Sequence, residues 1–200
     1  MDALDRYIQI STTEFNRYAS SLDRKCIRQA AEMILRATDS GNRLHITGIG
    51  KPAYVAGYAA SLISSTGTPA YYLHGTEAVH GSCGQLCEGD VVICISNSGE
   101  TAELKATAMA IRNNGCCIIS VTGNPDSWLG KYAEVCLCAA VDQEGGPLNR
   151  APRASILAEI YVIQCLSVVL QEAVGITPAE YVKRHPGGSL GKLRANEKID

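Results

Sequence analysis

The chain from Arg43 onward alternates short apolar runs with longer amphipathic segments, and this alternation limits the fold more than any other feature. The apolar runs are bounded by Gly, Ser, Asn and Asp, which is typical of strands buried on both faces. They occupy residues 44–48, 70–73, 91–96, 116–122 and 134–138. Helical spacing follows in residues 51–65, 101–114, 125–133 and 154–173. This repeated order predicts an α/β fold, a three-layer, doubly wound parallel sheet with helices on both faces.

An N-terminal segment of different character precedes this pattern. Between residues 2 and 38, apolar side chains such as Leu4, Ile8 and Phe15 recur at helical spacing with charges between them. We expect this helix to break around Asp23. The sequence therefore predicts a helical arm over residues 1–38 and one domain over residues 39–200, a size that suits a single core.

Composition argues against several classes of protein. The chain has 18 Lys and Arg against 20 Asp and Glu, a net charge of −2, which argues against nucleic acid or a membrane surface as a partner. Nine cysteines, an odd number partly inside apolar runs, indicate reduced thiols and a cytoplasmic location. The first residues have neither the basic start nor the apolar stretch of a targeting peptide. Residues 154–176 are apolar but interrupted by Glu and Gln, so we expect a core helix there.

Two polar loops stand where predicted strands lead into predicted helices. The first strand is followed by Gly48-Ile49-Gly50-Lys51, and the third by Ser96-Asn97-Ser98-Gly99-Glu100-Thr101. In a doubly wound sheet, ligands bind at such carboxyl ends, and helix N-termini attract anions. We predict a phosphate site from Gly50, Ser96, Ser98 and Thr101, with Ser65 as a further candidate. The alternative is an ordinary helix cap, because Ser and Thr favour that position for local reasons.

Three stretches together resemble a known family. GIGKPAYVAGYAASLISSTGTPAYYLHGTEAVHG, ISNSGETAEL and RHPGGSLGKL are similar, in order and spacing, to the SIS (sugar isomerase) domain of bacterial arabinose-5-phosphate isomerases. The resemblance covers residues 43–193. It implies a five-stranded parallel sheet, interconversion of D-arabinose 5-phosphate and D-ribulose 5-phosphate, and a tetramer built from dimers. Longer members carry two CBS modules, so this chain is expected to be the single-domain form.

The same resemblance supplies candidate catalytic residues at matching positions. They are Lys51, Glu103, Glu144, His185 and, less closely matched, His80. Aldose–ketose isomerisation removes a proton next to a carbonyl and stabilises an enediolate, so a carboxylate base and a cation are required. Either glutamate can be the base, and we expect Glu100 to share a helix face with Glu103. Arg153 stands where the family has Thr or Ser, which leaves the substrate open to a more anionic sugar.

We expect no metal and no organic cofactor. His74, His80, Cys83 and Cys87 do not have the spacing of a closed zinc site, and His45 inside the first predicted strand is interpreted as structural. Two other functions remain open: a non-catalytic sensor of phosphosugars, and a sibling enzyme such as 6-phospho-3-hexuloisomerase. The acidic arm is unlike a DNA-binding module, and the HPGG ending argues against the sibling. In the expected oligomer, we predict that His185 crosses to the Lys51 pocket of a neighbour.

Overall fold

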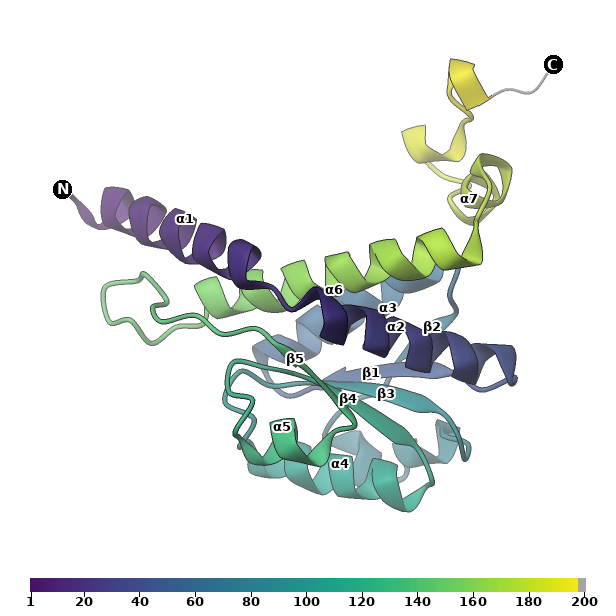
Figure 1. Cartoon of the computed structure of the whole chain (residues 1–200), viewed down its shortest axis with the longest axis horizontal. Coiled ribbons are helices and arrows are strands. Elements are labelled where there is room, and N and C mark those ends of the chain that lie inside the picture. Colours follow the sequence, from purple (N-terminus) through teal and green to yellow (C-terminus); the bar gives the residue numbers. More distant parts are fainter. Residues whose placement is uncertain (198–200) are drawn as a thin grey trace.

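A computed structural model of the chain describes residues 1–197. Its centre is a five-stranded sheet in the order β2-β1-β3-β4-β5, and every pair of neighbouring strands is parallel (Figure 1). The strands are β1 (Leu44–Gly48), β2 (Ala70–Tyr72), β3 (Val91–Ile95), β4 (Cys117–Thr122) and β5 (Val135–Cys138). All five predicted strands are confirmed, within a residue or two at their ends.

Helices cover both faces of this sheet and make three layers. They are α1 (Ala3–Ser21), α2 (Arg24–Asp39), α3 (Lys51–Ser65), α4 (Ala102–Asn113), α5 (Trp128–Tyr132), α6 (Ala154–Val174) and α7 (Pro178–Arg184). Helices α2, α3 and α6 pack together over one face, and α4 and α5 cover the other (Figure 1). The doubly wound α/β prediction is therefore confirmed. The predicted helix at 125–133 is shorter than expected, because Ser127 caps it and Ala133 is already extended.

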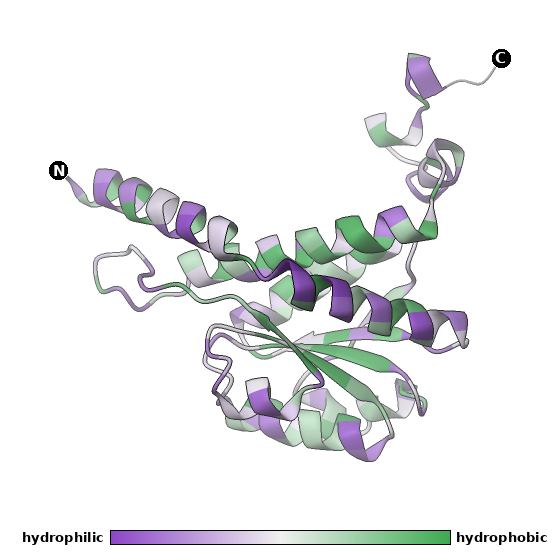
Figure 2. Cartoon of the chain, viewed as in Figure 1, coloured by the Kyte–Doolittle hydropathy of each residue, from purple (hydrophilic) through white to green (hydrophobic). Residues whose placement is uncertain are grey.

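Alternating side chains of each strand feed two separate apolar cores. On β3, Ile93 and Ile95 face the α2, α3 and α6 layer, whereas Val92 and Cys94 face α4. The strands are accordingly among the most hydrophobic segments in Figure 2. Burial on both faces is the reason that the strands read as continuous apolar runs.

The N-terminal arm consists of two helices that meet at residues 22–23. Asp23 caps α2, since its carboxylate accepts hydrogen bonds from the backbone N–H of Lys25 and Cys26, so the predicted break is confirmed. The Tyr18 hydroxyl donates to the Cys138 carbonyl at 2.9 Å and fastens α1 to β5. The start of α1 extends beyond the sheet, and Leu4 and Ile8 lie exposed on it (Figure 1).

Helix α6 is long and apolar enough to cross a membrane by length and composition, but half of its most apolar window is buried inside the protein. It contacts α1, α2 and α3 along its length. The expectation of a core helix over residues 154–173 is confirmed. Its positive-φ end at Gly175 leads through a short turn into α7, which lies beyond the far end of α6 (Figure 1).

A buried polar pair joins β1 to the loop before β3. The Asp90 carboxylate accepts hydrogen bonds from the N–H groups of Arg43 and Cys87, both at 2.8 Å, and lies 3.2 Å from His45 Nε2. Burial lowers the pKa of His45, so its ring is neutral and donates through Nε2–H. This confirms a structural role for His45, at the amino-terminal edge of the sheet.

Replacement of Asp90 tests how much this buried polar pair contributes to stability. Asp90→Ala leaves the buried Nε2–H of His45 and two partly buried backbone N–H groups without an acceptor, and we expect the free energy of unfolding to fall by about 3 kcal/mol. Urea unfolding followed by circular dichroism measures the change, with exposed Asp39→Ala as the matched control. A loss below about 1 kcal/mol would mean that water or neighbouring carbonyls replace the carboxylate.

Candidate active site

The strand order places a topological switch point between β1 and β3. The chain leaves β1 through α3 on one face of the sheet and leaves β3 through α4 on the other. Adjacent parallel strands lie about 4.8 Å apart, so the two polar loops begin side by side at the carboxyl edge. Ligands of doubly wound sheets bind at this place.

The loop after β1 is shaped by two glycines. A Cβ on Gly48 would lie 2.8 Å from the backbone carbonyl carbon and oxygen of Pro52, so no larger residue fits there. Gly50 has φ +68° and precedes Lys51, the first residue of α3, without capping the helix through a side chain. Lys51 is solvent-exposed, and its ammonium group is free to reach a ligand at this edge.

The loop after β3 presents hydroxyl groups at the start of α4. Ser96 is buried and its Oγ lies 3.3 Å from Thr101 Oγ1, whereas Ser98 is exposed and accepts a hydrogen bond from the Glu100 N–H. Gly99 has φ +65°, and a Cβ there would collide with Ser127. Thr101 occupies the cap position of α4 but makes no capping hydrogen bond. The N-terminus of this 12-residue helix is therefore available to an anion.

The two acidic residues near the start of α4, Glu100 and Glu103, have different surroundings. Glu103 lies exposed in the first turn of α4. The Glu100 carboxylate accepts from Lys105 Nζ at 2.5 Å and from the Trp128 N–H at 2.7 Å, which together hold the pKa of Glu100 below its usual range. The prediction of a shared helix face is wrong, because α4 begins only at Ala102 and Glu100 instead binds the start of α5.

Glu144 reaches the same edge from the loop between β5 and α6. Its Oε2 accepts hydrogen bonds from the backbone N–H of Arg153 at 2.5 Å and of Ser155 at 3.2 Å. The carboxylate thus caps the N-terminus of α6, the positive end of the helix dipole. Among residues 1–197, no hydrogen bond to the other oxygen, Oε1, is found. The Arg153 guanidinium turns back toward its own loop, with Nη1 3.5 Å from the Ala151 carbonyl oxygen.

His80 ends a 3-10 turn (Glu77–His80) that follows β2, and it is exposed. Between the loop after β1 and the segment after β2 lies a cavity of about 570 Å³ that the sequence did not reveal. Its walls combine the Gly48–Gly50 loop with aromatic and polar side chains: Tyr54, Tyr58, Tyr72, His74 and Thr76. Tyr54 and Tyr58 are four residues apart on α3, so they share one face of the helix. This spacing was the feature of the sequence from which an aromatic wall could have been predicted.

Two predicted site residues lie at the other edge of the sheet. Ser65 is the last residue of α3, about 21 Å along the helix from Lys51, and its hydroxyl donates to the Leu62 carbonyl. Within one chain Ser65 therefore lies away from the two polar loops, and its role in the phosphate site stays a prediction. His185 ends α7, beyond the 21 residues of α6, which span about 31 Å (Figure 1). Its Nδ1 lies 2.8 Å from the Tyr181 carbonyl, and the two rings stack.

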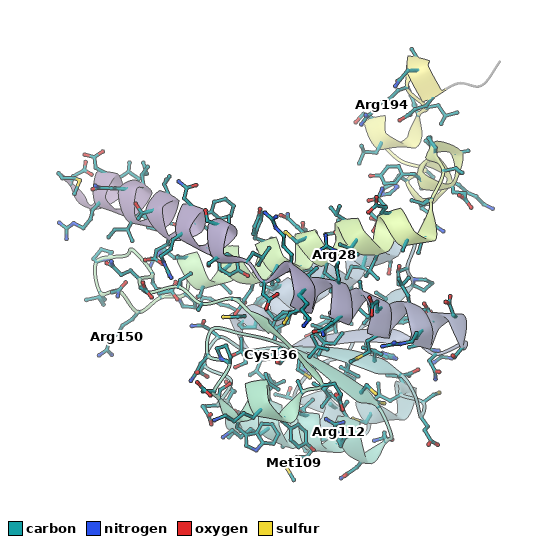
Figure 3. All side chains as sticks on the ribbon, in the orientation of Figure 1. Arg28, Met109, Arg112, Cys136, Arg150 and Arg194 are labelled. Atoms are coloured by element: carbon teal, nitrogen blue, oxygen red, sulfur yellow. The ribbon has the colours of Figure 1, made fainter. Side chains whose placement is uncertain are left out.

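The structure therefore brings most of the candidate residues to one edge. Each of these residues comes from a segment that follows the end of a strand or begins a helix. They are Gly50, Lys51, Ser96, Ser98, Thr101, Glu103, Glu144 and His80. Within residues 1–197, no group of three or more His, Cys, Asp or Glu side chains is arranged to hold a metal ion. All nine cysteines are free thiols. Figure 3 shows Arg150, from the loop before α6, pointing away from the sheet into solvent.

Curated proteins from several bacteria match most of this chain in sequence. Arabinose 5-phosphate isomerase KdsD of Pseudomonas aeruginosa is 41% identical over 164 residues, which are 82% of this chain and 49% of that protein. KdsD of Francisella tularensis is 35% identical over 185 residues, 92% of this chain and 56% of that one. The chain thus spans about half the length of these curated relatives.

A solved structure from E. coli CFT073, in complex with arabinose 5-phosphate, superposes with a TM-score of 0.82. It is 31% identical, and the match covers 92% of this chain and 95% of that one. The SIS domain model matches residues 38–168, a range that runs from the end of α2 through the sheet and into α6. Fold and sequence match agree, and the chain belongs to the SIS domain family.

Proposed function

We propose that this protein interconverts D-arabinose 5-phosphate and D-ribulose 5-phosphate. The observation that carries the proposal is the uncapped start of α4, with three hydroxyls, at the same edge of the sheet as the Lys51 loop and the start of α6, which binds Glu144. The KdsD enzymes and the arabinose 5-phosphate complex support it, since each matches most of this chain. The activity requires neither metal nor organic cofactor in this proposal.

The phosphate group binds at the start of α4. Ser96, Ser98 and Thr101 donate hydroxyl hydrogens, and the free N–H groups of the first turn add charge-assisted bonds. Lys51 approaches from the neighbouring loop and Gly50 lets the backbone come close. This grip orients the open-chain sugar so that its C1 and C2 face the carboxylates.

Glu144 is the base that we favour. Two backbone N–H groups fix one of its oxygens and leave the other for the substrate, whereas Glu103 is exposed and has no such restraint. In the forward direction, a carboxylate oxygen takes the proton from C2 of the aldose, and electrons from that C–H bond form an enediolate. The proton then returns to C1, so that the carbonyl moves from C1 to C2. Glu103 is the second candidate for this role.

Cationic and neutral donors serve the oxygen atoms of the sugar. Lys51 stabilises the enediolate oxygen, and His80 donates to a sugar hydroxyl at the same edge. His185 assists proton transfer between oxygens or ring opening. Because its own α7 lies at the opposite edge of the sheet, we place His185 in the site of a neighbouring protomer.

The proposal therefore includes an oligomer, a tetramer made from dimers. The exposed apolar side chains of α1 and α6, Leu4, Ile8, Leu157 and Val168, provide surface for such contacts. The substrate and the nine free thiols fit a cytoplasmic enzyme without a nucleic-acid or membrane partner. The domain boundary at residue 38 stays a prediction, because α2 packs into the same core as the sheet.

A phosphosugar sensor is the second candidate function. The same phosphate grip would serve it, but a sensor has no need for a carboxylate held by two N–H groups beside a lysine. The sibling 6-phospho-3-hexuloisomerase differs from the favoured enzyme in substrate length, so one substrate panel separates all three.

The first experiment tests the reaction itself. Purified protein with D-arabinose 5-phosphate, deuterated at C2, should form ribulose 5-phosphate and lose deuterium to solvent or carry it to C1, because an enediol route transfers that proton. NMR spectroscopy follows both changes, and the panel includes pentose and hexose phosphates. Binding of these sugars with no conversion would support the sensor.

The second experiment tests the phosphate grip. A charge-assisted hydrogen bond to phosphate is worth about 1.5 to 3 kcal/mol, so Ser98→Ala should raise KM more than tenfold and leave the melting temperature unchanged. Exposed Ser40→Ala, at the end of α2, is the control. An unchanged KM with a lower melting temperature would reduce Ser98 to a turn residue.

The third experiment tests the shared site. Lys51→Ala and His185→Ala proteins, each inactive, are mixed, unfolded and reassembled. Random pairing in a two-fold arrangement rebuilds roughly a quarter of the sites with both wild-type residues, so activity should return to about that fraction. Mass spectrometry confirms exchange of subunits. An inactive mixture with confirmed exchange would contradict the transfer of His185 between protomers.

A further inference from the structure

One ionisable side chain lies completely inside the apolar layer of α6. Glu159 exposes 0% of its surface, and neither of its carboxylate oxygens has a hydrogen-bond partner within residues 1–197. Its helix neighbours Ala158 and Val162 are buried and apolar. An unpaired carboxylate is far more costly to bury than the neutral acid, so this environment selects the protonated form.

The groups around Glu159 offer it no cation. The ionisable groups that interact with its charge are Glu144, from the loop before α6, and Tyr18 of α1, which also lies by Cys138 of β5. The Tyr18 hydroxyl is already committed to the Cys138 carbonyl. Helices α2 and α3 turn apolar side chains toward this layer: Ile27, Ala30, Ala31 and Ile34, and Val55, Ala56, Ala59 and Ala60. Burial, followed by the charge of Glu144, raises the pKa of Glu159 to about 8.

Helix geometry directs Glu159 toward the start of α6. Side chains of a helix lean toward its N-terminus, so residue 159 lies over Ser155, four positions earlier on the same face. The Ser155 hydroxyl is buried, and within the described residues it too lacks a partner. The backbone N–H of Ser155 donates to Glu144 Oε2. Glu144, Ser155 and Glu159 therefore form one polar line along an otherwise apolar helix face.

We propose that Glu159 is a positioning residue for Glu144. Kept neutral by its surroundings, it puts no second negative charge next to the first turn of α6, and this turn holds the Glu144 carboxylate through two N–H groups. A charged Glu159 would repel the half-buried Glu144 carboxylate across this turn, and the neutral acid does not. This inference rests on the proposed function, in which Glu144 is the base.

The pH dependence of stability tests the protonated state without reference to activity. The native chain keeps a proton on Glu159 that the unfolded chain releases above its ordinary pKa, so this residue lowers stability progressively as pH rises from about 4.3 to about 8. Glu159→Gln cannot titrate. Relative to wild type, its free energy of unfolding should therefore rise across that window and then level off.

A matched control lies on the same helix. Glu172 is exposed, and Glu172→Gln should give a stability curve parallel to that of wild type. If the Glu159→Gln curve is also parallel to wild type, Glu159 is ionised in the native protein and the inference is wrong. Infrared spectra of the wild type need no variant: a carboxylic acid C=O band should be present at about pH 6 and decline around pH 8, and absence of the band overturns the inference.

Kinetics test the link to Glu144. Wild-type kcat should fall above about pH 8 and be roughly tenfold lower at about pH 9, where about a tenth of Glu159 stays protonated. Glu159→Gln, whose amide stays neutral at every pH, should keep its kcat over this range, with KM unchanged in both. If the wild type is active and its kcat depends on pH in the same way as that of the variant, the inference about Glu159 is wrong and the proposed function stands. A wild type without isomerase activity overturns the proposed function as well.

Discussion

The pairing of β1 with β3 is the constraint on which the rest of the structure depends. Hydrogen bonds join these parallel strands from Leu44 with Val91 to Gly48 with Ile95. Because the chain leaves β1 toward one face of the sheet and β3 toward the other, no helix among residues 1–197 covers the space between their ends. Two loops from distant parts of the chain therefore open onto the same point.

Helix N-termini provide much of the polarity at this edge. Helices α3, α4 and α6 all begin there, and unpaired N–H groups at such ends attract anions. Glu144 occupies the start of α6, whereas the start of α4 has no side-chain cap. One helix thus holds a carboxylate of the protein itself, and another is open to a phosphate.

Helix α6 links the two edges of the sheet. Its first turn binds Glu144, its middle packs on α1, α2 and α3, and its last turn leads to α7 and His185 (Figure 1). The buried Glu159 lies in the part of this helix that is nearest to the site. The helix length of about 31 Å separates Glu144 from His185 within one chain. In the oligomer that we propose, a neighbouring protomer brings the two residues to one site.

The sequence by itself determined the local elements and the loops that matter. Apolar runs, glycines and serine-rich turns act over a few residues, so the strands, the break at Asp23 and the loop at Ser96 were predictable. Only the tertiary structure decided which residues meet. It directed Glu100 toward α5, placed Ser65 at the edge of the sheet opposite Lys51, and buried Glu159 without a partner among the described residues. These outcomes depend on helix direction and on packing between distant segments, which residue spacing along the chain does not encode.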